Sequence, residues 1–369
     1  MKRKTFYIWF LFVYFLAVPK SLDASVRIDP SPLGVQNGKL GTRFNFDFQF
    51  TNPSYKNRQS SGIYTGVLGT ENDNYDKFVV ATFSNRDSSV FSFYPGGENV
   101  YYPYKNVSMS LGLTWMKLIG YHKNYLEVAF TQINPFLPTS KFDQPENLIN
   151  TLPFFIQKIS VKNISDSLQS GYILISHSDG FEINQDSLSH NKVLLMNGEN
   201  DKNGIRALAV PDTLPDLSYE IGDLIFDNFN RTGKLDNSVL PNKAQGGFSW
   251  KFRLQPGEEK EWIFIYAGYY AGQVMTDKRF NPEKTLKFYY TKNYHSIYDV
   301  LRWVTANRDI ILNKTNKFEL LLKESFLTEE EKFTIAFAFH SYFPNTFLLC
   351  DENNSDYRYY VWEGSVKYI

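Results

Sequence analysis

Between residues 25 and about 294 the chain alternates short apolar runs with clusters of turn residues. Several runs alternate apolar with polar positions, which is the period of a strand with one buried face. The intervals carry Asn-Gly, Pro-Gly-Gly and Ser-Asp-Gly, which favour turns. Six runs are predicted strands, at residues 78–83, 126–130, 154–159, 172–175, 193–196 and 205–210. Many strands without intervening helices predict a large antiparallel β-sandwich.

The most regular pair of predicted strands lies at residues 248–254 and 260–266. Both segments alternate apolar and polar residues, and Pro256 and Gly257 lie between them. Proline and glycine supply the backbone geometry of a tight turn. The sequence therefore predicts a β-hairpin whose two strands share one inward face.

The spacing of apolar residues becomes helical after about residue 294. Over residues 297–326 apolar side chains recur every three or four positions, as they do on one face of a helix. Asn307 and the residues 313–316 interrupt this spacing with asparagine and threonine, so the stretch can divide into two helices at these positions.

A second helical signal follows at Thr328-Glu-Glu-Glu331, which forms a capping box. In this motif the Thr328 hydroxyl and the Glu331 carboxylate each accept a hydrogen bond from the other residue's backbone amide. Pro344 is expected to end the helix. The predicted fold class is therefore mainly β, a large antiparallel sandwich with helix concentrated after about residue 296.

The charged residues balance, because lysine plus arginine and aspartate plus glutamate each number 39. No basic block stands out in the sequence, which argues against nucleic acid as a partner. Aromatic residues make up 17 % of the chain, with 25 Tyr and 32 Phe. Aromatic side chains favour the half-buried surface of a sheet, so composition alone favours a large β protein over a carbohydrate-facing surface.

The N-terminus has the pattern of an export signal. Residues 2–4 are basic, residues 6–18 are apolar, and Ala24 provides a small residue for cleavage. This predicts a signal peptide over residues 1–24 and an exported protein, periplasmic or extracellular. The cleavage motif is imperfect, so a retained N-terminal anchor stays an alternative. Cys350 is the only cysteine, which excludes an intrachain disulfide.

Candidate chemistry lies in the last part of the chain, where a single glutamate, Glu363, is surrounded by Tyr359, Tyr360, Trp362 and Tyr368. Aromatic faces stack on sugar rings, and a carboxylate can attack or stabilise an anomeric carbon. The segment therefore predicts one wall of a sugar-cleaving site. The sequence holds no metal-ligand spacing, phosphate-binding glycine loop or Ser-His-Asp arrangement, so neither a metal nor a cofactor is expected.

The same region resembles the glycoside hydrolases of family 52, the β-xylosidases. That family carries a Ser-Tyr-Tyr-Gly-Asn-Thr segment shortly before Val-Asn-Glu-Gly. Similar residues stand here at 341–342 (Ser-Tyr), 345–346 (Asn-Thr), 348–349 (Leu-Leu) and 361–364 (Val-Trp-Glu-Gly). The match continues more thinly upstream. Residues 29–34 resemble the family's Ser-Pro-Val-Gly opening, and residues 288–295 resemble its Tyr-Phe-Tyr-Thr-Arg run.

The resemblance implies an N-terminal β-supersandwich joined to a C-terminal (α/α)6 barrel. Carried over residue by residue, it gives Glu363 the role of catalytic nucleophile. Residues of the same segment are then expected to contact an oligosaccharide substrate; these are Trp362, Tyr360, Tyr342 and Asn345.

Three departures limit what the resemblance implies. Asp29 and Pro30 stand where the family has a pair of histidines before its Ser-Pro-Val-Gly opening. Trp362 stands where the family has asparagine, so a polar contact is lost or replaced by stacking. The family's proton-donating aspartate belongs to the helical barrel, beyond the position that matches Ile369. Retaining hydrolysis needs such a donor about 5 Å from the nucleophile, so this chain alone is expected to be inactive.

The sequence thus predicts three parts: a signal peptide (1–24), a β-supersandwich (25–295), and linker helices with the start of an (α/α)6 barrel (296–369). The expected function is retaining hydrolysis of β-xylosides in xylo-oligosaccharides, with a partner chain or downstream segment completing the barrel. The alternatives are a non-catalytic carbohydrate-binding or scaffold protein and a β-glucosidase similar to family 116.

Overall fold

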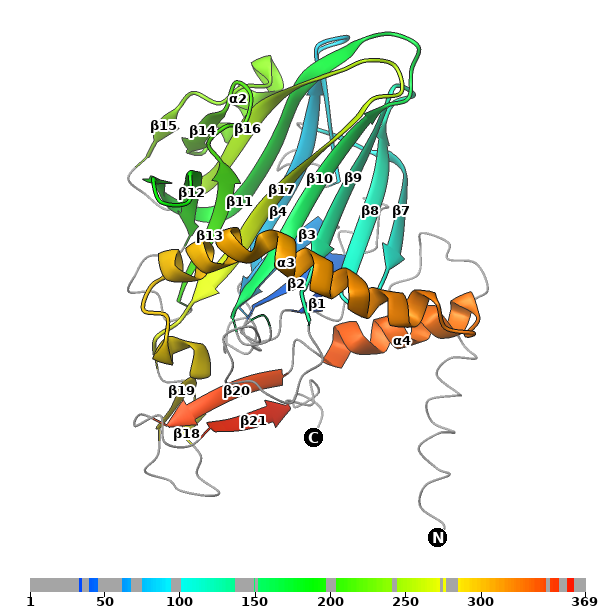
Figure 1. The fold of residues 1–369 in the computed structure, drawn as a ribbon. Helices are drawn as coiled ribbons and strands as arrows, with labels where there is room; N and C mark the ends of the chain where they lie inside the picture. Colours follow the sequence, from blue (N-terminus) through cyan, green and yellow to red (C-terminus); the bar gives the residue numbers. More distant parts are fainter. Residues whose placement is uncertain are drawn as a thin grey trace, which may run out of the picture.

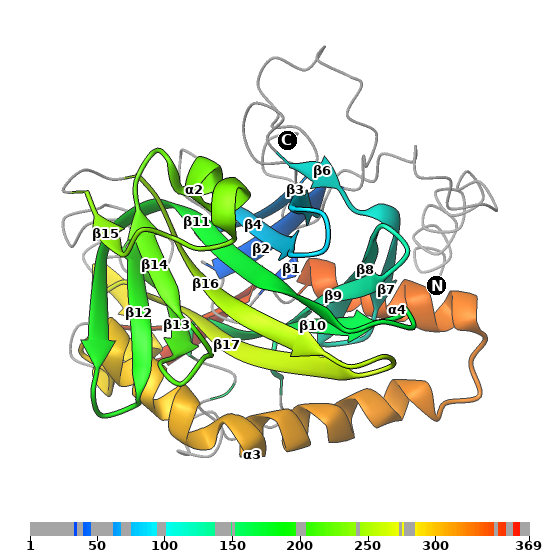
Figure 2. The same ribbon diagram turned by 90° about the horizontal axis from the view of Figure 1, so that it is seen from above.

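The computed structural model shows a sandwich of two β-layers with a helix on each outer face (Figure 1; Figure 2). The predicted signal peptide and its alternative, an N-terminal anchor, lie outside the described residues. None of the described helices is long and apolar enough to cross a membrane. The structure describes residues 33–34, 40–45, 62–67, 75–93, 101–136, 149, 152–196, 204–240, 244–272, 275–276, 285–342, 346–351 and 357–361.

Seventeen strands form one hydrogen-bonded sheet that folds over on itself at its longest strand. The first layer contains β1 (Leu33–Gly34), β2 (Leu40–Asn45), β3 (Gly62–Val67), β4 (Tyr75–Ser84), β5 (Ser89–Ser92), β6 (Tyr102–Pro103), β14 (Ser218–Ile221), β15 (Ser238–Val239) and β16 (Ala244–Leu254). The second layer contains β7 (Lys105–Leu111), β8 (Trp115–His122), β9 (Leu126–Ile133), β10 (Phe154–Asn163), β12 (Asn191–Met196), β13 (Ile205–Pro211) and β17 (Glu259–Tyr269).

The strand β11 (Gln169–Asp186) belongs to both layers. Its first half pairs with β4 and β16, and its second half pairs with β12. The register shifts between His177 and Gly180, where a bulge lets the strand bend. Most pairings are antiparallel, although β5–β6 and β14–β15 are parallel. The predicted mainly β fold is confirmed, and each of the six predicted runs lies in a strand.

The main core fills the space between the two layers. In the second layer the strand β8 alternates cleanly, with every second side chain buried. Aromatic rings from opposite layers meet there: the Trp250 ring of β16 lies 5.9 Å from Trp262 and 5.0 Å from Phe264 of β17. Phe155 and Tyr266 stack at 4.6 Å within the second layer. Burial of these large rings contributes strongly to the hydrophobic stabilisation of the fold.

The predicted hairpin at Pro256 and Gly257 is wrong in its pairing. Both strands form, but in the described residues β16 pairs with β11 and β14, while β17 pairs with β10 and β13. The turn therefore carries the chain from one layer to the other. The alternation of apolar residues defines an inward face for each strand, and two inward faces can meet across a core as well as along one sheet.

Asn163 fixes this corner, because it lies where both crossings between the layers meet. Its buried side-chain amide donates to the backbone oxygens of Ser167 (2.8 Å) and Leu254 (3.1 Å), and its Oδ1 accepts from the backbone amide of Ser165. The backbone of Asn163 also exchanges hydrogen bonds with Gly257 and Glu258. One side chain thus ties the β10–β11 connection to the β16–β17 connection.

Two helices cover the outer faces. A short helix that the sequence did not predict, α2 (Ile225–Thr232), packs Ile225 and Phe229 on the first layer. The long helix α3 (Ile297–Lys323) crosses the second layer, where its first half buries a row of aliphatic residues: Ile297, Val300, Leu301 and Val304. Figure 2 shows the resulting order of helix, sheet, sheet and helix.

The helix α3 is continuous, so the division expected at Asn307 and residues 313–316 does not occur. The Asn307 side chain donates to the Trp303 carbonyl within the helix (2.8 Å), and Thr315 is buried. Asparagine and threonine reduce helix propensity by less than about 1 kcal/mol each, which packing against the sheet outweighs.

The second predicted helix is confirmed as α4 (Glu329–Tyr342), which ends before Pro344. Its capping box has the expected geometry, with the Thr328 amide donating to Glu331 (2.8 Å) and the Glu331 amide donating to the Thr328 hydroxyl (3.3 Å). The described residues that follow form strands rather than further helices.

A second, four-stranded sheet lies below α3 in Figure 1. It consists of β18 (Met275–Thr276), β19 (Thr285–Phe288), β20 (Thr346–Asp351) and β21 (Tyr357–Val361), with the short 3-10 helix η3 (Tyr289–Lys292) after β19.

Candidate functional site

The four-stranded sheet brings together two segments that are far apart in the sequence. β19 pairs with β20, with Phe288 opposite Leu349. β20 in turn pairs with β21, with Thr346 opposite Val361. The strand β19, which leads into the matched run 288–295, and the strands β20 and β21 before the predicted nucleophile are therefore neighbours in space.

The described residues include only part of the predicted site. The backbone of Tyr360 lies in β21 opposite Phe347, and Tyr342 is the last residue of α4. Glu363, Trp362 and Asn345 lie outside the described residues. The structure thus positions the strand that leads to the glutamate.

An aromatic cluster joins this sheet to the sandwich. The Tyr290 hydroxyl accepts a hydrogen bond from the backbone amide of Tyr270 (2.8 Å), just after β17. Its ring stacks on Phe288 (5.5 Å) and meets Tyr269 edge to face (5.9 Å). Tyr290 is buried, and burial raises the pKa of its hydroxyl above the ordinary range. The neutral phenol therefore acts as a fixed polar anchor within an apolar joint.

Cys350 is a buried thiol in β20 and packs on Tyr289. Burial, and then the neighbouring Asp351 charge, raise the pKa of the thiol. A protonated, buried thiol is a poor nucleophile, so Cys350 serves packing rather than chemistry.

Two polar contacts fix α3 along the second layer. At its first half, the Arg302 guanidinium donates to both carboxylate oxygens of Asp186, which lies at the end of β11 (3.0 and 3.2 Å). At its second half, the Glu319 carboxylate accepts hydrogen bonds from the backbone amides of Leu113 (3.0 Å) and Thr114 (2.5 Å) in the β7–β8 turn. These two contacts hold both halves of α3 against the sandwich.

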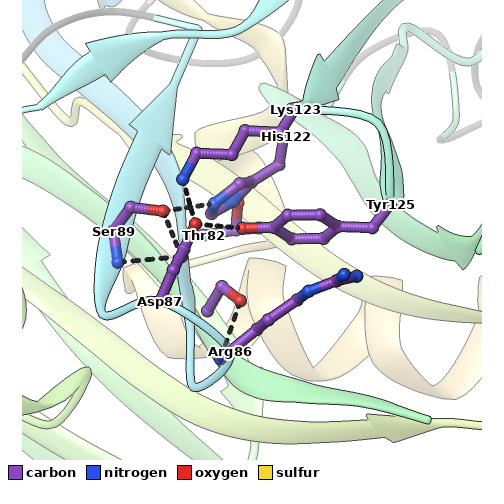
Figure 3. A network of polar contacts seen from close by, with 8 residues as sticks. Thr82, Arg86, Asp87, Ser89, His122, Lys123 and Tyr125 are labelled. Carbon is purple, nitrogen blue, oxygen red and sulfur yellow. Dashed lines mark hydrogen bonds and ion pairs between the residues drawn. The ribbon is translucent and has the colours of Figure 1, made fainter. Parts of the chain in front are cut away.

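A polar network lies at the opposite end of the sandwich, where the β4–β5 and β8–β9 turns meet (Figure 3). His122 is fully buried between Thr82, 2.7 Å from its Nδ1, and Ser89, 3.0 Å from its Nε2. The Ser89 hydroxyl donates to Asp87 (2.5 Å), and the Tyr104 hydroxyl donates to Thr82 (3.0 Å).

These contacts determine which nitrogen of His122 carries a hydrogen. Because the Ser89 hydroxyl gives its hydrogen to Asp87, His122 Nε2 must donate to Ser89. His122 Nδ1 then accepts from Thr82. The imidazole is thus neutral, in agreement with burial that lowers the pKa of His122 to about 3.

Asp87 forms the outer end of the network. Burial by itself raises its pKa, but hydrogen bonds from Lys123, Ser89 and Tyr125 outweigh this and lower the pKa to about 2. The Arg86 guanidinium lies over the Tyr125 ring, 5.0 Å from its centre. The two turns are therefore locked together by charge and hydrogen bonding.

The network is not a hydrolytic triad, although it contains serine, histidine and aspartate. The aspartate binds the serine and not the histidine, so His122 lacks the carboxylate that would stabilise its protonated form. With a pKa of about 3, His122 is also a poor base near neutral pH. No spacing in the sequence indicated this network, because its members come from several separate strands and turns.

The sandwich interior holds a second buried histidine. The His177 ring lies 4.4 Å from Phe78 and 5.1 Å from Tyr266, and burial, then the Arg206 charge, hold its pKa well below the ordinary value. The nearby amide of Gln157 is fully buried without a partner among the described residues. Ordered water is the usual partner of such a group. Within the described ranges no group of three or more His, Cys, Asp or Glu could hold a metal.

Comparison with known proteins bears on the second half of the chain. Residues 187–369 match the sequence model of glycosyl hydrolase family 52. This match includes β12 to β21, the helices α3 and α4, and the predicted Glu363 segment. No curated protein sequence matches the chain.

Two solved structures are similar in outline. A protein assigned as a kojibiose phosphorylase, from the human microbiome, is 10% identical over 89% of this chain and 41% of that chain, with a TM-score of 0.34. A mutant of the heparan sulfate lyase HepC from Pedobacter heparinus is 9% identical over 88% of this chain and 41% of that chain, with a TM-score of 0.31. The chain spans about two fifths of the length of each.

Proposed function

From the match of residues 187–369 to the sequence model of glycosyl hydrolase family 52, we propose that this chain carries the nucleophile of a β-xylosidase. The family supports a glycosidase, and the xylose specificity and the role of Glu363 are our proposals. The observation that carries them is the pairing of β19, β20 and β21. It brings the segments 288–295 and 346–361 together directly before the predicted nucleophile.

The proposed reaction is retaining hydrolysis of a β-xyloside in two steps. The Glu363 carboxylate attacks the anomeric carbon, and the bond to the leaving oxygen breaks while a carboxylic acid protonates that oxygen. Water then attacks the anomeric carbon and releases xylose and the free carboxylate. In this proposal the second carboxyl group belongs to a helical (α/α)6 segment, on the same polypeptide or on a partner chain.

The remaining predicted residues are proposed to hold the sugar. The Tyr360 and Trp362 rings offer faces that can stack on a xylose ring, and the Tyr342 hydroxyl and Asn345 amide can hydrogen-bond its hydroxyl groups. Trp362 in place of the family's asparagine would exchange one polar contact for a stacking surface.

The test uses a substrate that does not need the proton donor. In 2,4-dinitrophenyl 2-deoxy-2-fluoro-β-xyloside the leaving phenolate departs without protonation, and the fluorine slows hydrolysis of the covalent intermediate. Mass spectrometry of the protein is expected to show one added fluoroxylosyl group, and peptide mapping is expected to place it on Glu363. Glu363→Gln should abolish the label, and Glu352→Gln, a glutamate of the same region, should keep it.

Other outcomes separate the alternatives. Faster labelling by the corresponding glucoside would replace the xylosidase proposal with a β-glucosidase. A label on a different carboxylate would refute the role of Glu363. Absence of any label, together with calorimetric binding of xylo-oligosaccharides, would identify a non-catalytic carbohydrate-binding protein.

A further inference from the structure

The outward face of α3 carries apolar side chains in its second half. Leu320 and Leu321 are both exposed, and Leu321 is 67% exposed. Ile310 lies on the same face, about three turns earlier, and is also exposed. The opposite face of the helix is the one that packs on the sheet, through residues such as Val304 and Ile311. Much of the apolar surface of these leucines is therefore left uncovered by the described part of the chain.

The corner after α3 extends this surface. Phe326 is fully exposed in the turn between α3 and α4, and Leu327 beside it is partly exposed. Figure 1 shows the corner projecting beyond the sandwich. Exposed large apolar side chains gathered at a projecting corner favour a site of association over a solvated face.

The outward face of α3 carries charges that would complement those of an identical, antiparallel helix. We call the four residues of this face, named next, the α3 stripe. Lys317, Leu320, Leu321 and Glu324 are spaced so that all four lie on one face of the helix. Lys317 and Glu324 are exposed, and neither forms an ion pair with another described residue. If two such helices lie antiparallel about a two-fold axis between Leu320 and Leu321, the leucines meet at the axis. Each Lys317 then faces the Glu324 of the other copy.

We propose that this stripe is an isologous interface, through which two copies of the chain pair by antiparallel contact of their α3 helices. A two-fold contact uses the same patch on both copies and closes after two. Leucines at the axis and reciprocal ion pairs at the rim match the usual arrangement of such interfaces. Phe326 of each copy would lie beside the part of the second helix that directly precedes Lys317.

The mixed charge of the patch favours a second copy over a lipid surface. Glu324 ends α3, and the acidic residues 329–331 begin α4 on the other side of the Phe326 corner. These carboxylates would be repelled by anionic lipid headgroups. In a second copy the same Glu324 meets a lysine.

The mass of the full chain in solution tests the proposal. Sedimentation equilibrium should give a concentration-dependent mass that approaches twice 42.9 kDa. Leu321→Asp should give a monomer at every concentration measured, because it places two carboxylates at the axis. Leu224→Asp is the matched control, since Leu224 is 61% exposed beside α2 on the other layer, and it should leave the dimer intact.

A charge exchange gives a second test that requires no loss of packing. Lys317→Glu and Glu324→Lys each turn two attractive contacts into repulsive ones, and each should weaken the dimer about tenfold or more. The double variant restores both pairs with the signs exchanged, and should recover the affinity. A monomer at all concentrations, a larger open-ended assembly, or a double variant weaker than both single variants would overturn the proposal.

Discussion

Removal of the Arg302 side chain tests how α3 is held on the sandwich. The Asp186 carboxylate is only 2% exposed, and it receives three hydrogen bonds from Arg302 and one from the Ser189 hydroxyl (2.5 Å). Arg302→Ala would leave this buried charge with Ser189 as its remaining side-chain donor. A carboxylate that loses its cation in this way destabilises the folded chain, because its desolvation is no longer offset.

The magnitude follows from the exposure of the two groups. Breaking a fully buried ion pair costs about 3–5 kcal/mol, and hydrogen bonds to charged groups contribute about 1.5–3 kcal/mol. The Arg302 side chain is itself 40% exposed, so water can replace part of its contribution. We expect Arg302→Ala to lower the free energy of unfolding by about 2 kcal/mol.

Amide hydrogen exchange and urea unfolding measure this effect together. Exchange should accelerate in the first half of α3, around residues 297–311, more than in the interior strands. Arg308→Ala is the matched control, because Arg308 pairs with the largely exposed Asp309 on the same helix and should cost about 0.5 kcal/mol or less. Equal effects of the two substitutions would refute the view that Asp186 clamps the helix.

The same pair predicts a dependence on pH. Burial alone would raise the pKa of Asp186, but the hydrogen bonds and charge of Arg302, with Ser189, lower it below the ordinary value. The stability that this group contributes is present above the carboxyl pKa of the unfolded chain and is lost as the pH falls through the folded value. Asp186→Asn should therefore flatten the acid limb of the stability curve.

Three further substitutions test other parts of the fold. Asn163→Ala should lower the free energy of unfolding by about 2 kcal/mol, measured by urea unfolding, because it leaves the buried oxygen of Leu254 without its donor. Gly112→Ala should lower the melting temperature, because a methyl group there would overlap the Glu319 carboxylate and the Trp115 ring. The His122 imidazole should show no NMR titration between about pH 5 and 8, and its depressed pKa should make folding less stable as the pH falls from about 6.5 toward 3. A His122 titration near pH 6.5 would contradict the assigned proton network.

The sequence predicted the strands and the change to helix well, because both depend on local periodicity. The six apolar runs are strands, and α3 begins at Ile297, close to the predicted change near residue 296. The pairing of strands was harder. The alternation around Pro256 and Gly257 contained no information on whether the next strand returns beside its neighbour or crosses the core. The buried Asn163, distant in sequence, stabilises the crossing through its hydrogen bond to the backbone oxygen of Leu254.

The missed elements have a similar cause. The helix α2 has few residues, and only its contact with the first layer, through Ile225 and Phe229, makes it stable. β20 and β21 follow a helix and were expected to continue a helical domain, but their residues pair with β19 from a different part of the chain. The candidate site was predicted from motifs of the sequence, and the role of its residues stays a prediction. The β-sheet that precedes it in the chain forms by long-range pairing of strands, and no local sequence pattern contains that information.

The boundary of the family match does not coincide with a boundary of the fold. The match begins at residue 187, within the turn after β11, so it includes β12, β16 and β17 but not β10 and β11, with which these strands also pair. β12 and β16 both pair with β11, and β17 pairs with β10. A fragment of residues 187–369 would therefore expose three unpaired strand edges and the inner face of the second layer. It should not fold alone, whereas addition of the separately expressed preceding residues should restore a cooperative transition. A soluble fragment with native-like hydrogen exchange would show that the second half is an independent domain. The dependence of the matched half on the preceding strands implies that residues before 187 belong to the same folding unit.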